Sequence, residues 1–193
     1  GLRMLSTFKG FITTEGASKL PKSLTLLKTE FGVFDSNEAM SYIGHVSNIE
    51  LRSFHTTPHP QLNENWLSSL LHPSTSPGHQ ISLSESSSLN GVNHRLTSLL
   101  VYVGEEENSC CLLDKPFFDS IAKFINLHSL DISKNAGLPP DWLCLIPQSV
   151  TNLEVQDLNA YPTATQLSLL PKRLKSLNLV VLVEEDSLCD WTD

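Results

Sequence analysis

The stretch LHSLDISKN, from Leu127 to Asn135, alternates apolar and polar residues in the manner of a short, half-buried strand. Its pattern is L-x-x-L-x-I-x-x-N. Alternate side chains of a strand point to opposite sides, so Leu130 and Ile132 are expected to face a core together while Asp131 faces outward. One strand cannot bury its own leucines, so the stretch predicts further layers of chain stacked beside it.

Weaker copies of this pattern occur elsewhere in the chain. Three of them begin with a proline motif, which reads L-P-x-x-L-x-x-L or its equivalent: LPKSLTLL at residues 20–27, IPQSVTNL at residues 146–153 and LPKRLKSL at residues 170–177. Proline has no amide donor and keeps the preceding residue out of helical conformation. Each proline motif is therefore predicted to end one outer segment and to turn the chain into the next strand.

The copies recur at similar spacings. Their second apolar anchors are predicted to stack on one another, and successive anchors lie 22, 22, 50, 31, 23 and 24 residues apart; they are Leu5, Leu27, Ile49, Leu99, Leu130, Leu153 and Leu177. The spacing of 50 leaves room for one further copy, for which Ile81 and Leu83 are the candidates. This period predicts about eight turns whose short strands pair into a parallel sheet.

Segments between the strand patterns have apolar residues at helical spacing. In one of them Asp35 is followed by Glu38, which predicts a helix over residues 35–43 with a capping box that starts at Asp35. Further helical segments are predicted at residues 63–71, 114–125 and 162–170. Residues 138–147 are predicted to form only about one turn of helix. The middle turns have longer helices and reach the next strand without the proline motif.

Over nearly its full length the chain resembles leucine-rich repeat proteins. The proline motif is similar to the L-P-x-S-L-T-x-L of FNIP-type repeats and to the L-P-x-x-L-x-x-L of bacterial effector leucine-rich repeats, although the unequal spacings depart from both. The resemblance implies an α/β solenoid of about eight irregular turns, with short parallel strands on a concave face and helices or loops on a convex face. It also implies that Asn135 satisfies backbone groups where the chain turns. The alternative is an ordinary leucine-rich globular domain.

One domain over residues 1–193 is predicted, as part of a longer solenoid. Leu2 already lies in a strand pattern with no polar cap before it, and a turn that begins after Leu179 is not finished. The Ser-rich residues 72–93 are predicted to form an irregular loop insertion. Phosphorylation of the serines from Ser84 to Ser88 in this insertion would add negative charge near the sheet.

Composition argues against several classes of partner. The net charge of −8 offers no basic surface, so no nucleic-acid partner is predicted. No apolar run approaches the roughly 20 residues of a membrane helix, so no membrane insertion is predicted. Four scattered cysteines do not make a disulfide framework, which favours a cytoplasmic or other intracellular location.

The sequence contains no motif for catalysis or for binding a cofactor. It has no phosphate-binding glycine loop, nucleophile elbow or H-E-x-x-H. His55 and His59 lie four residues apart, but Pro58 argues against a shared helix face and no third metal ligand is evident. Cys110 and Cys111 follow acidic residues, which disfavour a reactive thiolate. The prediction is therefore a non-enzymatic protein with no cofactor and no metal.

The remaining candidates for function are the residues between the buried anchors. One row lies directly between the anchors of each strand and a second row lies two residues further along, so both are expected on the concave face. Of these the predicted partner-binding residues are Lys28, Glu30, Glu50, Arg52, Leu100, Tyr102, Asp131, Ser133, Glu154, Gln156 and Asn178. Tyr102 and Arg52 are the expected energetic anchors, because Tyr and Arg are enriched at binding hot spots.

Binding of a protein partner through this face is the leading hypothesis. The same residues also fit a sheet face that is merely solvated. A second hypothesis is an architectural segment of a large assembly whose ends dock on neighbours. A third is the substrate-recognition part of a ubiquitin ligase, which would need a catalytic or F-box-like segment elsewhere.

Overall fold

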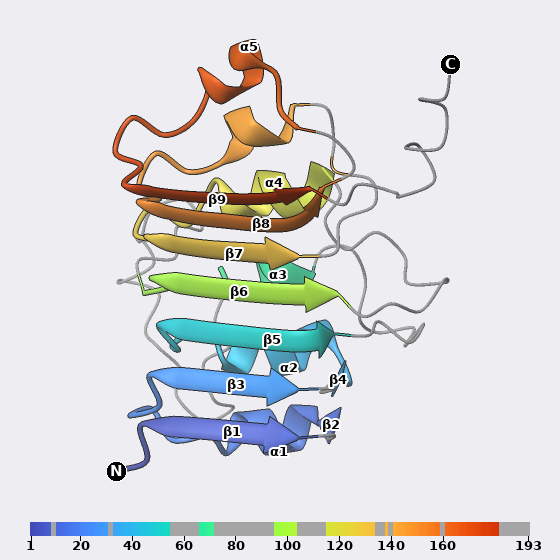
Figure 1. Ribbon diagram of the computed structural model, residues 1–193. Coiled ribbons are helices and arrows are strands. Elements are labelled where there is room, and N and C mark those ends of the chain that lie inside the picture. Colours follow the sequence, from blue (N-terminus) through green and yellow to red (C-terminus); the bar gives the residue numbers. More distant parts are fainter. Residues whose placement is uncertain are drawn as a thin grey trace, which may run out of the picture.

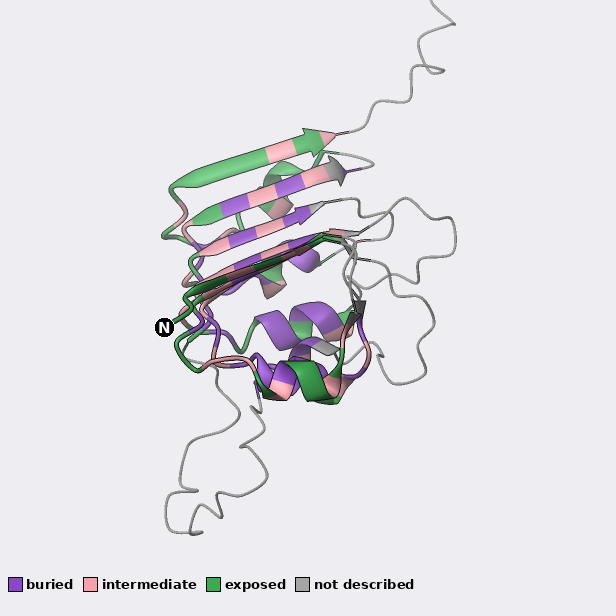
Figure 2. Ribbon diagram, turned by 90° about the horizontal axis from the view of Figure 1, so that it is seen from below, coloured by how far each residue is buried: buried purple, intermediate pink, exposed green. Residues whose placement is uncertain are grey.

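A computed structural model describes residues 1–8, 11–30, 33–54, 66–71, 95–103, 115–133, 138, 141–158 and 161–181. In these residues the chain forms an α/β fold with a single seven-stranded parallel sheet that does not close into a barrel (Figure 1). The helices cover one face of the sheet (Figures 1 and 2). The other face, which carries no helix of the described residues, is called the open face below.

The strands are ordered in the sheet as they are in the chain, β1-β3-β5-β6-β7-β8-β9. They are β1 (Met4–Phe8), β3 (Leu26–Glu30), β5 (Asn48–Phe54), β6 (Ser98–Val103), β7 (Ser129–Ser133), β8 (Asn152–Leu158) and β9 (Ser176–Val181). A small second sheet pairs β2 (Phe11–Ile12) with β4 (Val33–Phe34). Each inner strand of the main sheet therefore lies between the strands that precede and follow it in the chain, an order that is compatible with a solenoid.

All seven predicted anchors lie in register across the sheet. Leu5 pairs with Leu27, Leu27 with Ile49, and the pairing continues in the same way through Leu99, Leu130, Leu153 and Leu177. The prediction of about eight turns differs from the seven strands that the main sheet contains in the described residues. Because β5 pairs directly with β6, no strand lies between them. The proposed extra anchors Ile81 and Leu83 lie outside the described residues, as does the whole predicted insertion over residues 72–93.

Helices occur where the apolar spacing predicts them, except that the first was not predicted. They are α1 (Thr14–Ser18), α2 (Asn37–Tyr42), α3 (Trp66–Ser69), α4 (Lys115–Ile121), the 3-10 helix η2 (Trp142–Leu145) and α5 (Ala164–Leu167). The helix α1 escaped prediction because it is five residues long and buries only Ala17, so it has no apolar periodicity. The predicted polar ladder at Asn135 lies outside the described residues.

The prediction that Asp35 caps α2 is wrong. Ser36 is the N-cap, and its hydroxyl accepts the Ala39 N–H at 3.0 Å. Asp35 instead accepts three hydrogen bonds, from the Thr14 N–H and hydroxyl of the preceding turn and from the Ser36 hydroxyl, each at 3.0 Å. A carboxylate can take the free first amide of α1 as readily as one of its own helix, and here it joins the two helices.

The proline motif forms the same tight turn each time. The N–H of Leu24 donates to the carbonyl of Pro21 at 2.9 Å, and the corresponding bonds at Pro147 and Pro171 are both 3.0 Å. Val46 and Leu127 make equivalent bonds to Ile43 and Phe124, where no proline is present. The bend therefore survives in the middle of the chain without proline.

Hydroxyl groups join successive turns just before the strands. The side chains of Thr25, Ser47, Thr97 and Thr151 each donate to a backbone carbonyl of the preceding turn, at 3.0–3.2 Å. Those carbonyls also accept backbone N–H groups of the same following turn. Ser or Thr directly after the first apolar anchor thus has a structural role that the sequence pattern did not indicate.

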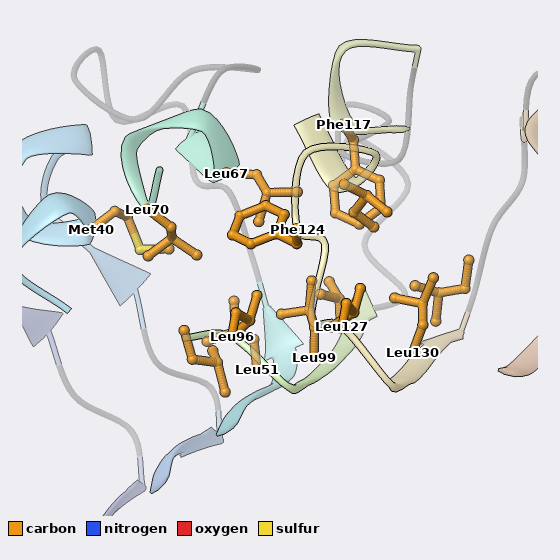
Figure 3. Packing of buried hydrophobic residues seen from close by; sticks show 14 of the residues in the cluster. Met40, Leu51, Leu67, Leu70, Leu96, Leu99, Phe117, Phe124, Leu127 and Leu130 are labelled. Carbon is orange, nitrogen blue, oxygen red and sulfur yellow. The ribbon is translucent and has the colours of Figure 1, made fainter. Parts of the chain in front are cut away.

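The core lies between the sheet and the helices. In Figure 3, Leu99 and Leu127 lie opposite Leu67 and Phe124, and all four are fully buried. Phe117 packs edge-to-face on Phe118, with ring centroids 5.3 Å apart. Aromatic pairs of this geometry stabilise by about 0.5–1.5 kcal/mol beyond their burial. The core is therefore continuous from the strands to the helix layer.

Candidate functional site

The first row of predicted site residues lies on the open face in perfect register. Lys28 pairs with Glu50, Glu50 with Leu100, and the row continues through Asp131, Glu154 and Asn178. Each residue stands between two inward-facing anchors of its strand, so its side chain is directed outward. Facing side chains on adjacent strands are close enough to interact.

The second row is in register only in parts. Glu30 pairs with Arg52, and Tyr102 pairs with Ser133. The register shifts after Leu51 in β5 and after Val155 in β8, just where Arg52 and Gln156 stand. An irregularity of this kind lets two residues on one strand oppose one on the next and redirects their side chains.

Charged side chains pair at the β3–β5 part of the open face. Lys28 Nζ lies 2.8 Å from Glu50 Oε1, and Arg52 Nε lies 3.9 Å from Glu50 Oε2. The guanidinium carbon of Arg52 lies 5.6 Å from the centre of the Tyr102 ring, within the range of a cation–π interaction. One carboxylate is thus held between two cations, and one of these cations also covers an aromatic ring.

Hydrogen bonds continue the network from β6 to β9. The Tyr102 hydroxyl donates to Asp131 Oδ2 at 3.3 Å and accepts Gln156 Nε2 at 3.0 Å. Gln156 Nε2 also donates to Glu154 Oε1 at 2.7 Å, and Asn178 Nδ2 donates to the same oxygen at 3.2 Å. Contacts between side chains therefore link β3 to β9 without interruption.

Burial and neighbouring carboxyl groups shift the pKa values of Asp131 and Tyr102. Burial and then the nearby charge of Glu154 raise the pKa of Asp131 from 3.8 to about 6, while the hydrogen bond from Tyr102 and the charge of Arg52 oppose this rise. Asp131 Oδ1 is buried and has no hydrogen-bond partner among the described residues. Burial and then the charge of Asp131 raise the pKa of Tyr102, so its hydroxyl remains a neutral donor at physiological pH.

Eight of the eleven predicted site residues take part in this network. Of the other three, Glu30 is exposed, Leu100 is partly buried, and only the backbone position of Ser133 is described. The sequence indicated which residues share the face but not the contact between Gln156 and Tyr102. That contact spans the intervening strand β7 and is made next to the irregularity in β8.

The described part of the chain holds no group of three or more His, Cys, Asp or Glu side chains that could bind a metal ion. No helix among these residues is long and apolar enough to cross a membrane. His55, His59, Cys110 and Cys111 lie outside the described residues. The described part of the open face offers hydrogen-bond donors and acceptors, side chains of both charges and the Tyr102 ring, all of which can contact a partner.

No family model matches the sequence, and no curated protein matches it significantly.

Proposed function

We propose that this chain forms an intracellular leucine-rich repeat solenoid that binds a protein partner through its open, concave sheet face. Three features support the solenoid: the strands follow the chain order, the seven anchors share one register, and the helices lie on one side. A stack of this kind presents an extended surface on one side, which repeat proteins use for binding.

The observation that carries the proposal is the network around Arg52 and Tyr102. Neighbouring groups already hold both side chains, because Arg52 lies over the ring and Tyr102 is hydrogen bonded to Asp131 and Gln156. Side chains ordered before binding lose less conformational entropy when a partner docks. Arg and Tyr at the centre of a surface are also the residue types that most often dominate binding energy.

Affinity capture with the purified chain tests the proposal. Partners would be identified by mass spectrometry and one of them purified for calorimetry. Replacing Tyr102 with Ala should weaken binding of that partner at least about tenfold, because truncation of a central hot-spot residue costs at least about 1–2 kcal/mol. Arg52→Ala should also weaken it.

The matched control is Lys115→Ala on the helix side, where Lys115 forms an exposed pair with Asp119. It should leave the affinity unchanged. Thermal unfolding of all three variants should show native-like melting, which separates lost contacts from lost folding. If Tyr102→Ala and Arg52→Ala bind the partner as tightly as wild type, the open face is not the binding surface.

A further inference from the structure

Apolar side chains that are buried in the earlier turns become accessible at the C-terminal end of the sheet. Leu153 in β8 is 2% exposed, whereas Leu177, its partner in register in β9, is 41% exposed. The helix α5 contains no buried residue, and its Leu167 is exposed. Figure 2 shows the same change, since β9 is coloured mostly as exposed and β8 mostly as buried or intermediate.

The backbone of β9 has a neighbour on one side only. It is the last strand in the sheet order, and among the described residues it pairs with β8 alone. The outer edge of such a strand presents N–H and C=O groups that can pair with another extended chain. Addition of a strand at an edge is a common mode of peptide recognition, in which backbone bonds provide affinity and side chains provide selectivity.

The charged side chains of residues 161–181, which include β9, are all positive. On the adjacent strand, Glu154 accepts a hydrogen bond from Asn178 of β9. Residues 161–181 contain Lys172, Arg173 and Lys175 and no Asp or Glu, although the whole chain has a net charge of −8. All three side chains are exposed, and none forms an ion pair within the described residues. The backbone N–H of Lys175 donates to the Thr151 carbonyl, which places these cations at the start of β9.

Of the other exposed lysines of the described residues, two are paired, whereas Lys22 and Lys123 form no ion pair there. Lys19 pairs with Glu15, and Lys115 with Asp119. The opposite edge of the sheet, at β1, exposes less of its inward-facing leucine, because Leu5 is partly buried whereas Leu177 is exposed. Free backbone, accessible core leucine and unpaired positive charge therefore coincide at β9.

We propose that β9 binds an extended segment of another protein that carries acidic residues at one end and alternating apolar residues along its length. The apolar side chains would cover Leu177 and the neighbouring core layer. The acidic residues would lie beside Lys172, Arg173 and Lys175. This surface is separate from the open face and goes beyond the proposed function. A second copy docked through the same end would bring like charges together, which makes it a poorer occupant.

Fluorescence anisotropy with the full chain and two labelled peptides tests this proposal. The peptide DEDVTVTVTV has an acidic end, and KRKVTVTVTV is its charge-reversed twin. The acidic peptide should bind at least about tenfold more tightly at low salt, since several exposed charge pairs of about 0.2–1 kcal/mol each add to the strand contacts. The preference should shrink as salt is added.

The triple variant Lys172→Glu, Arg173→Glu, Lys175→Glu should reverse the preference. Its matched control is Lys22→Glu, because Lys22 occupies the same place in the first proline motif as Lys172 occupies in the last. The control should behave as wild type. Equal binding of both peptides, or equal effects of the triple variant and the control, would overturn the proposal.

Hydrogen exchange distinguishes strand addition from loose charge attraction. The acidic peptide should slow exchange of the β9 amides in wild type, and protection confined to any other element would contradict the assignment. Replacement of Glu184, Glu185 and Asp186 by Gln tests whether the chain itself occupies the surface. Unchanged affinity for the acidic peptide supports an external segment. Affinity raised at least about tenfold would show that β9 is already covered and would overturn the proposal.

Discussion

The same proline motif occurs near both ends of the sheet, but its last leucine is buried to a different extent at each. LPKSLTLL at residues 20–27 leads into β3, and LPKRLKSL at residues 170–177 leads into β9. Leu27 is fully buried, while Leu177 at the same place in the motif is 41% exposed. The difference arises because β3 lies between β1 and β5, whereas β9 has a neighbour on one side only among the residues that the structure describes. The motif bends the chain, and neighbouring layers decide whether its leucines are buried.

The N-terminal end is also joined more firmly. Asp35 accepts hydrogen bonds from Thr14 in the preceding turn, so α1 and α2 are fastened to each other. At the C-terminal end α5 has a capping box between Thr163 and Gln166, which lie in the same helix. A capping box stabilises its own helix but does not connect that helix to another layer.

Truncation of the two equivalent leucines should produce the largest difference between the ends. Leu27→Ala should lower the free energy of unfolding by about 2–5 kcal/mol, because it leaves a cavity in a packed core. Leu177→Ala should cost less than about 1.5 kcal/mol, because its side chain already contacts solvent. Urea denaturation monitored by circular dichroism measures both. Equal losses would mean that the end of the sheet at β9 is covered as well as its interior.

Removal of the link between α1 and α2 should make the N-terminal end resemble the C-terminal end. Asp35→Ala is expected to cost about 1–3 kcal/mol, because it leaves several donors without their charged acceptor. Hydrogen exchange should then speed up in α1 before the rest of the molecule.

Asp35→Asn should recover part of the loss, since the amide keeps one acceptor oxygen. The control is Asp119→Ala, which removes only an exposed i,i+4 pair with Lys115 and should cost less than about 0.5 kcal/mol. If both alanine variants lose the same small amount, the link through Asp35 does not stabilise the fold.

The surroundings of the carboxyl groups on the open face also differ between its β3–β5 part and its β7–β8 part. Glu50 lies between Lys28 and Arg52, whereas Asp131 lies beside Glu154 and has a pKa raised to about 6. The folded state thus binds the Asp131 proton more tightly than the unfolded state, in which the pKa is near 3.8. The contribution of Asp131 to stability is therefore fully present below pH 3.8 and is lost as the pH rises through about 6.

Asp131→Asn should consequently stabilise the protein at pH 7.5. About 1 kcal/mol is expected, after allowance for solvent screening of this half-buried group, and the gain should vanish toward pH 4. Denaturation of wild type and variant at a series of pH values measures this difference in the free energy of unfolding. The separate variant Glu154→Gln should have a lower Asp131 pKa than wild type, as measured by NMR of the carboxyl carbon. A gain in stability that does not depend on pH would contradict this account.

The smallest effect is expected for the ion pair at the other end of the open face. Lys28→Ala should lower the free energy of unfolding by less than about 1 kcal/mol, because the pair with Glu50 is partly exposed to solvent. The loss should decrease in high salt. A double-mutant cycle with Glu50→Ala isolates the interaction, and a coupling above about 2 kcal/mol would show that the pair is much less screened than its exposure indicates.

Much of the fold was predictable from local patterns. The alternation around Leu130 indicated which residues face inward, and the spacing of the anchors indicated their register, because each turn repeats the same bend. The cap of α2 was predicted one residue too early, since Asp35 and Ser36 are both good caps and only the position of Thr14 decides between them. The residues of the candidate site were predictable as a face, but not their contacts with one another.

The sequence by itself determined the inward and outward sides of each strand and the bend at each proline motif, because these depend on residues a few positions apart. Only the tertiary structure decided that Gln156 contacts Tyr102, that burial and the charge of Glu154 raise the pKa of Asp131, and that Leu177 remains exposed. These properties depend on which strands become neighbours and where their register shifts. Identical leucines in identical motifs therefore have different environments according to the layers that pack against them.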